Sequence, residues 1–315
     1  MSNKPLDLHA KRVLDMLAMA GPVDASKLSV TEQRHHFRKL MSLSGSTVPT
    51  GGIEDCAAPG PGGPIGLRVY TPSGISVERR PGVIYFHGGG LVAGSLDTHD
   101  SICRTLANET SCRLISVDYR RAPEHKFPAA IIDGYAATIW VIEHAAELRI
   151  DQNRIAVAGD SAGATLAAVV CQLARHEQAF NLAAQLLLCP ITDFAVRTQS
   201  RLAFATGYLL DEAMLERDLK YYLPDGADVS DPRISPLRAA DLSGLPPAYI
   251  HTAEFDPLRD EGRAYGVRLT RAHVKVVYTC HPGMIHLFYA MPGAIPYART
   301  VLKRIGSELK AELGC

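Results

Sequence analysis

The sequence predicts an α/β fold in which a mostly parallel central sheet carries helices on both faces. From about residue 65 onward, short apolar runs alternate with segments of helical periodicity. This alternation is typical of parallel strands joined by crossover helices. The run Gly82–Phe86 is apolar without polar alternation, which is the pattern of a strand buried on both faces.

Composition fits a globular protein that acts on an uncharged partner. The chain has 315 residues, 47% hydrophobic and 21% charged, enough for one large core. Lys+Arg and Asp+Glu both total 33, so the formal net charge is zero. This balance argues against nucleic acid or an anionic membrane as a partner and fits a small uncharged substrate.

Cysteine usage favours a cytoplasmic protein. Seven cysteines are scattered without a C-x-x-C pair, and their odd number does not complete a disulfide framework. Charged residues interrupt the first twenty-one positions, so we expect no signal peptide. Since neither H-x-x-x-H nor H-x-x-E-H occurs, we expect no metal and no other cofactor.

Two amphipathic helices are expected before the alternating region, over residues 6–20 and 30–44. Ser29 and Glu32 have the spacing of a capping box at the start of the second helix, which Gly45 can end. The Gly- and Pro-rich stretch 45–66 is expected to be a loop. Its segment GPGGPIG precedes a strand and contains prolines, which argues against a nucleotide-binding loop.

Apolar runs predict seven strands: 67–70, 82–87, 113–119, 154–160, 183–190, 247–256 and 274–280. Residues 190–235 interrupt the alternation with an amphipathic helix and a loop rich in Pro, Asp and Gly. An insertion of this size after a strand end lies where a lid would lie.

The segment Gly159-Asp160-Ser161-Ala162-Gly163 matches the G-x-S-x-G nucleophile elbow. A predicted strand runs directly into it, and a helix of small residues follows. A serine on such a sharp turn exposes its hydroxyl, while the helix N-terminus offers free N–H groups where negative charge develops. Ser161 is therefore the expected nucleophile.

A glycine run, His87-Gly88-Gly89-Gly90, directly follows an earlier predicted strand. This is the oxyanion-loop motif of lipases and esterases, in which glycines let backbone N–H groups approach a carbonyl oxygen. We expect the N–H groups of Gly88 and Gly89 to form an oxyanion hole together with that of Ala162.

An acid and a histidine should follow the serine in chain order. Asp256 ends a predicted strand and is the favoured acid; Asp260 is the second choice, and Glu254 lies still within the strand pattern. His286 is the expected base, and His281 is its rival because it lies nearer the preceding strand end.

Together these residues resemble the hormone-sensitive-lipase-like family of bacterial carboxylesterases. The matching segments follow the family's order: HGGGLVAGSLDTHD (87–100), VDYRRAPEHKFPAA (117–130), GDSAG (159–163), DPRISPL (231–237), AEFDPLRDEG (253–262) and GMIHLF (283–288). The resemblance implies the α/β-hydrolase fold, with Ser161, Asp256 and His286 as triad and Gly88, Gly89 and Ala162 as oxyanion hole. It favours Asp256 over Asp260 and His286 over His281, and it implies that His87 orients the glycine loop.

The resemblance also implies a cap and a division of the chain. Residues 1–45 would form the N-terminal part of the cap and 190–235 its insertion, while 46–189 and 236–315 would form the hydrolase core. A homodimer is a further implication of the resemblance. Arg121, Ala164 and Leu287 depart from the family pattern without removing a reacting group.

The expected function is hydrolysis of small, uncharged, short-acyl esters through an acyl-enzyme. One alternative is a ligand-binding protein that keeps the pocket and has lost catalysis. Another is amide or lactone hydrolysis, which would use the same residues.

Overall fold

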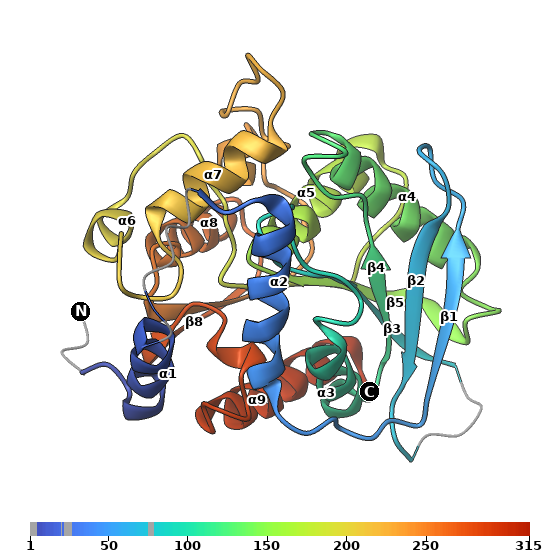
Figure 1. The fold of residues 1–315 in the computed structure, drawn as a ribbon. Helices are drawn as coiled ribbons and strands as arrows, with labels where there is room; N and C mark the ends of the chain where they lie inside the picture. Colours follow the sequence, from blue (N-terminus) through green and yellow to red (C-terminus); the bar gives the residue numbers. More distant parts are fainter. Residues whose placement is uncertain (1–4, 20, 22–26, 75–78) are drawn as a thin grey trace.

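Eight strands form one mostly parallel sheet in the order β1-β2-β4-β3-β5-β6-β7-β8 (Figure 1). The computed structural model describes residues 5–19, 21, 27–74 and 79–315. β2 pairs antiparallel with β1 and β4, and the other neighbouring strands are parallel. The strands are β1 Gly52–Ala58, β2 Ile65–Thr71, β3 Arg80–Phe86, β4 Arg113–Asp118, β5 Ile150–Asp160, β6 Ala184–Leu188, β7 Ala248–Phe255 and β8 Val276–Ile285.

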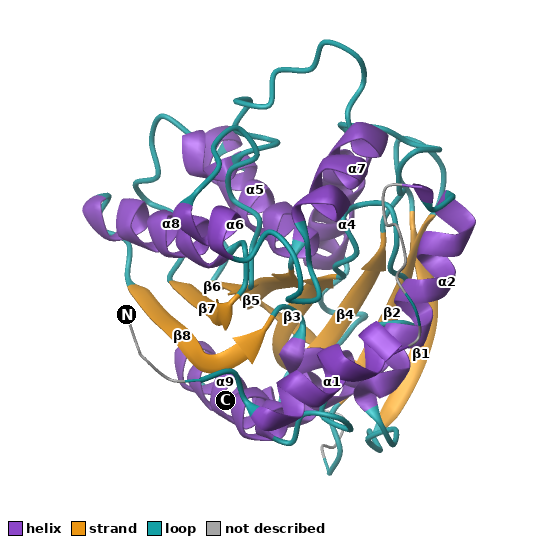
Figure 2. Ribbon diagram, turned by 60° about the vertical axis from the view of Figure 1, so that its left-hand side comes forward, coloured by secondary structure: helices purple, strands orange, loops and turns teal. Residues whose placement is uncertain are grey.

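Helices cover both faces of this sheet (Figure 2). One face carries α4 (Ala129–Glu143), α5 (Ala162–Glu177) and α8 (Arg259–Arg271), and the other carries α3 (Asp100–Thr110) and α9 (Tyr297–Leu313). Successive residues of β3 point to opposite faces, so Ile84 packs in one apolar core and Tyr85 in the other. The predicted α/β fold with a mostly parallel sheet is confirmed.

All seven predicted strands are present, but β1 was not expected. The stretch 45–66 was predicted as a loop, and that prediction is wrong for Gly52–Ala58. β1 is an edge strand whose central residues, Glu54 to Ala57, are exposed. Backbone hydrogen bonds to β2 hold this strand in the sheet. Since its exposed side chains need not be apolar, the strand carries no apolar pattern that sequence reasoning could detect.

The two N-terminal helices lie close to their predicted positions, as α1 (Leu8–Met19) and α2 (Val30–Met41), the latter followed by a short 3₁₀ helix, Ser42–Ser44. Residue 20, the predicted end of the first helix, lies outside the described residues. The capping box of Ser29 and Glu32 at the start of α2 is confirmed. Within the described ranges, no helix combines the length and the apolarity needed to cross a bilayer.

The insertion folds into α6 (Gln199–Ala203) and α7 (Glu212–Tyr222). α2 connects this region with the glycine loop. Its Gln33 amide donates to the Asp218 carboxylate of α7 at 2.7 Å. Its Arg34 guanidinium donates to the carbonyl oxygen of Val92 at 2.9 Å, just beyond the glycine run. α2 and α7 therefore meet beside the segment that was predicted to bind an oxyanion.

Candidate active site

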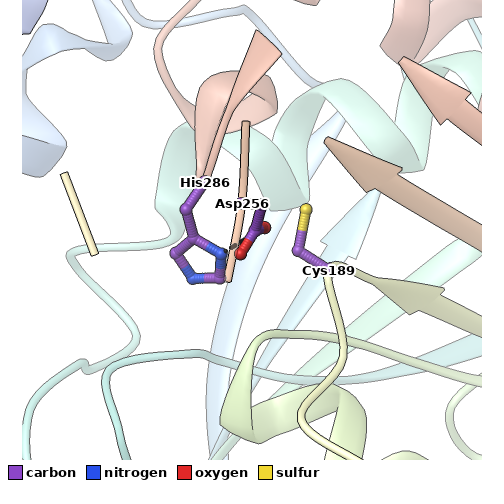
Figure 3. Close-up of side chains that lie close together, drawn as sticks. All are labelled: Cys189, Asp256 and His286. Carbon is purple, nitrogen blue, oxygen red and sulfur yellow. Dashed lines mark hydrogen bonds and ion pairs between the residues drawn. The ribbon is translucent and has the colours of Figure 1, made fainter. Parts of the chain in front are cut away.

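The carboxyl ends of three parallel strands bring Ser161, Asp256 and His286 together. Ser161 follows β5, Asp256 follows β7 and His286 follows β8. The Nε2 atom of His286 lies 3.1 Å from the Oγ atom of Ser161. The Nδ1 atom of His286 lies 2.8 Å from the Oδ2 atom of Asp256 (Figure 3). All three side chains are buried. The arrangement forms a continuous path for a proton from the hydroxyl to the imidazole, which the carboxylate orients.

The turn that carries Ser161 is strained, as a nucleophile elbow requires. Ser161 has φ 53°, in the left-handed region, and is the N-cap residue of α5. Glycines make this turn possible: a Cβ on Gly163 would lie 2.0 Å from the carbonyl oxygen of Phe86, and one on Gly159 2.4 Å from the backbone of Gly163. The Ser161 N–H donates to the Leu188 carbonyl oxygen at 2.8 Å, which ties the elbow to β6.

The two rival acids have other partners. Asp260 accepts the backbone N–H of Ser200 at 2.8 Å, at the start of α8. Glu254 accepts the backbone N–H of Gly283 at 2.8 Å. Of the three acids weighed in the sequence, Asp256 is the one whose carboxylate bonds to His286.

The rival base, His281, is also occupied elsewhere. It is buried, and its Nε2 atom lies 3.1 Å from the Nδ1 atom of His251. Burial, followed by the charge of His251, lowers the pKa of His281 to about 3. His87 is likewise held neutral, since burial and the charge of His99 lower its pKa to about 3. Its Nδ1 atom lies 2.9 Å from the Gly88 carbonyl oxygen, so it contacts the glycine loop itself.

The glycine loop requires one correction. The N–H of Gly88 donates to the Oδ1 atom of Asp160 at 2.9 Å, so it has no hydrogen left for a substrate oxygen. By contrast, the backbone N–H groups of Gly89, Gly90 and Ala162 make no hydrogen bond within the described part of the chain. The expectation that Gly88 is an oxyanion donor is therefore wrong, and Gly90 offers the free N–H in its place.

Asp160 is a functional candidate that sequence reasoning missed. It is fully buried, and besides Gly88 it accepts the hydroxyl of Tyr85 at 2.7 Å and lies 3.3 Å from the Nε2 atom of His99. Burial by itself raises the pKa of Asp160, but the charge and hydrogen bond of His99 and the Tyr85 hydroxyl outweigh it, and the pKa lies below its ordinary value. The carboxylate thus joins the elbow to the glycine loop. The only hint in the sequence was its place as the variable residue of G-x-S-x-G.

Cys189, Asp256 and His286 form a group of metal-ligand types, with ligand atoms all within 4.8 Å of one another. Two ligands bound at about 2.1 Å on a tetrahedral ion lie about 3.4 Å apart. The Nδ1 atom of His286 and the Oδ2 atom of Asp256 are only 2.8 Å apart, which is a hydrogen-bond distance. Their geometry suits a shared proton better than a bound ion.

Comparison with known proteins agrees with this picture. A family model described as the alpha/beta hydrolase fold matches residues 83–290. The chain is 36% identical over 307 residues to an arylesterase of Saccharolobus solfataricus, covering 97% of this chain and 98% of that protein. It is 39% identical over 290 residues to the carboxylic ester hydrolase LipN of Mycobacterium tuberculosis, covering 89% and 77% respectively.

The fold of this chain is also similar to solved structures of ester hydrolases. The ester-hydrolase EH1AB1 from the metagenome of Lake Arreo, in complex with a bipyridine phosphonate derivative, superposes with a TM-score of 0.96 at 39% identity, covering 98% of this chain and all of the other. A hyperthermophilic esterase from Pyrobaculum calidifontis gives a TM-score of 0.93 at 38% identity, covering 98% and 99%. The chain therefore belongs to the α/β-hydrolase fold family, in the hormone-sensitive-lipase-like group of carboxylesterases.

Proposed function

We propose that this protein is a serine carboxylesterase that hydrolyses small, uncharged esters through an acyl-enzyme. The observation that carries the proposal is the hydrogen-bonded chain from Ser161 Oγ through His286 to Asp256, at 3.1 and 2.8 Å. The similar proteins named as ester hydrolases support the same reaction class. A binding protein without catalysis would have no use for this chain of hydrogen bonds.

In the proposed reaction, Ser161 Oγ attacks the ester carbonyl carbon while its proton passes to the Nε2 atom of His286. The carbonyl oxygen becomes an oxyanion and accepts the free N–H groups of Gly89, Gly90 and Ala162, near the positive end of the α5 dipole. The intermediate collapses and the alcohol leaves with the proton from His286. Water then attacks the acyl-enzyme, with His286 again as base, and releases the carboxylic acid.

Asp256 has the orienting role in this proposal. Its Oδ1 atom accepts the N–H of Leu258 at 2.9 Å, which fixes the carboxylate, and its Oδ2 atom accepts the Nδ1–H of His286. An imidazole held in this tautomer presents an unprotonated Nε2 to the serine and is stabilised when it becomes charged.

We further propose that residues 1–45 and 190–235 form a cap over the site and that the acyl pocket is short. The contacts of α2 with α7 and with Val92 support a roof at the glycine loop. Asp218 of α7 lies against that loop: a Cβ on Gly90 would be 2.0 Å from its Oδ2 atom. An additional methylene favours binding by about 0.8 kcal/mol only while apolar surface remains to receive it.

A cytoplasmic location is also proposed. It is supported by the seven cysteines, which are all free thiols.

The test is a panel of nitrophenyl esters with increasing acyl length. We expect the highest kcat/KM for acyl chains of about two to eight carbons. Ser161→Ala should remove turnover, while Ser307→Ala, an exposed serine of α9, should leave it unchanged. Near-wild-type rates in Ser161→Ala would overturn the nucleophile assignment. A higher kcat/KM for the matching anilide or lactone would favour the alternative activities, and preference for emulsified long-chain triglycerides would contradict the closed cap.

A further inference from the structure

Two thiols lie in direct contact at the end of the sheet opposite the triad. Cys112 lies between α3 and β4, and Cys315 follows α9. Their Sγ atoms are 3.4 Å apart, although the residues are separated by 203 positions in the chain. The Sγ atom of Cys112 also lies 3.5 Å from the carbonyl oxygen of Thr110. Because β3, β4 and β5 are parallel, the start of β4 lies away from the strand ends that carry the triad, and the pair has no role in the proposed reaction.

Close packing of α3 against α9 brings the two thiols together (Figure 1). Gly306 of α9 lies so near α3 that a Cβ on it would be 2.3 Å from the Cβ atom of Glu109. The Nζ atom of Lys310 in α9 donates to the hydroxyl of Ser111 at 3.0 Å. These contacts hold the end of α9 against the turn that precedes β4.

The two thiols differ in exposure and in their hold on a proton. Cys112 is fully buried, whereas Cys315 is partly exposed. The hydrogen bond with Cys112 is the main cause that lowers the pKa of the Cys315 thiol, and burial opposes it. The positive charges of Arg154, Lys310 and Arg80 lower the same pKa further. The hydrogen bond to Cys315, followed by burial, raises the pKa of Cys112. Cys315 therefore loses its proton first.

An accessible thiolate beside a second thiol is the arrangement that reacts with peroxides and then forms a disulfide. The thiolate is the form that attacks the peroxide, and the second thiol traps the oxidised sulfur before further oxidation. Cys56 is also exposed, but burial of its thiol, then the charges of Asp55 and Glu54, raise its pKa. Exposure by itself therefore does not make Cys56 equivalent to Cys315.

We propose that Cys315 and Cys112 form an oxidation site, at which a hydroperoxide drives formation of a reversible disulfide between the end of α9 and the start of β4. First, the Cys315 sulfur attacks one oxygen of the peroxide and the O–O bond breaks. The sulfur is oxidised to a sulfenic acid, and the other oxygen takes a proton and leaves as water or an alcohol.

In the second step, the Cys112 sulfur attacks the sulfenic sulfur of Cys315. The S–S bond forms, and the hydroxyl group leaves as water with the Cys112 proton. The sulfurs of a disulfide lie about 2.05 Å apart, so only a small approach is needed from the observed contact of 3.4 Å. A small thiol compound reverses the reaction by thiol–disulfide exchange.

The disulfide form should be the more stable one. Its bond closes a loop of about 200 residues, which restricts the unfolded chain. The thermal midpoint should therefore rise by about 3–8 °C on oxidation and return on reduction.

The test treats the full chain with a small excess of hydrogen peroxide, which is then removed with catalase. The readouts are the number of titratable thiols after denaturation, the masses of unreduced peptides, and the thermal midpoint before and after dithiothreitol. Cys315→Ala and Cys112→Ala each remove one member of the pair. Cys56→Ala is the matched control, because Cys56 is an exposed thiol outside the pair.

We expect the wild-type protein to lose two of its seven thiols and to yield one peptide pair joined through Cys112 and Cys315. Dithiothreitol should restore both thiols and the original midpoint. Cys56→Ala should give the same linked peptides and the same rise in midpoint. Cys315→Ala should give neither. In Cys112→Ala, Cys315 should proceed to a sulfinic acid, which dithiothreitol does not reverse.

A wild-type protein that keeps all its thiols, or whose disulfide joins other cysteines, would overturn the proposal, as would an unchanged midpoint in the linked form. If Cys112→Ala does not fold, Cys315→Ala decides by itself, since truncating a partly exposed side chain removes little buried surface. None of these readouts needs ester turnover, so the result is independent of the esterase assignment, which is tested by Ser161→Ala.

Discussion

Replacing Asp160 with alanine should damage both stability and turnover, because one buried carboxylate holds the glycine loop against the elbow. The change leaves the hydroxyl of Tyr85 without its acceptor and leaves the N–H of Gly88 with only the Nε2 atom of His99, at 3.2 Å, at positions closed to water. A stranded donor costs about 1–3 kcal/mol, so the free energy of unfolding should fall by about 1–3 kcal/mol from Tyr85 and by up to the same amount again from Gly88. A loop that loses this anchor no longer aims its free N–H groups, and kcat should fall about 10²- to 10³-fold.

Two quantities are measured for each variant. The free energy of unfolding comes from urea titration monitored by the fluorescence of Trp140, and kcat is measured with nitrophenyl acetate as substrate. Asp133→Ala is the control, since Asp133 is also buried and pairs with Arg120 at 2.8 Å. It should lose stability while its kcat stays within about 3-fold of wild type. Asp160→Asn keeps an oxygen acceptor for both stranded donors and should be the milder change if the alanine variant does not fold.

A folded Asp160→Ala that retains the kcat of Asp133→Ala would contradict this role of the Asp160 carboxylate. That result would mean that the loop keeps its conformation without the carboxylate. Asp160→Asn keeps the oxygen acceptor but loses the negative charge. If its kcat is as low as that of Asp160→Ala, the effect comes from the charge beside His99.

The remaining predictions concern the triad, acid stability and metals. Ser161→Ala should abolish ester turnover and leave the thermal midpoint nearly unchanged, because it removes one hydroxyl from a turn whose backbone bonds stay. Asp256→Asn should lower kcat by about 10⁴-fold, since it favours the wrong tautomer of the base. If Asp256→Asn were active and Asp260→Asn inactive, Asp260 would be the acid that orients His286. The pKa values of His87 and His281 are depressed to about 3, so the unfolded chain binds more protons below pH 6.5 and stability is lost as the pH falls. Between pH 7.5 and 5.5 the two histidines should together contribute a loss of about 3 kcal/mol in the free energy of unfolding, opposed by Asp218 and Glu261, whose pKa values burial raises to about 6 and about 7. The contribution is measured by urea titration as the pH dependence that changes when both histidines are replaced; a pH dependence that stays the same after their replacement contradicts their buried neutral state. Chelators should leave kcat/KM unchanged, and a loss that added metal restores would reveal a metal requirement.

Much of the architecture was predictable because buried parallel strands are apolar throughout. The apolar run Gly82–Phe86 predicted β3 without any information about the strands next to it. β1 could not be found in this way, since its exposed edge residues carry no apolar pattern and its partner strand alone defines it. A strand held by backbone bonds to a single neighbour leaves little trace in its side chains.

The sequence by itself determined the parts of the candidate site that depend on local backbone geometry. The elbow at Ser161 needs glycines at 159 and 163 because a Cβ at either would meet backbone atoms, and the motif records that requirement directly. The tertiary structure decided which groups meet. Gly88 and Asp160 lie far apart in the chain, and only the pairing of β3 with β5 brings the N–H of one to the carboxylate of the other. The same holds for Cys189 and Asp256, which the order β5-β6-β7 places side by side. Local conformation is set by a few neighbouring residues, whereas a hydrogen-bond partner is set by strand order, which no short motif encodes.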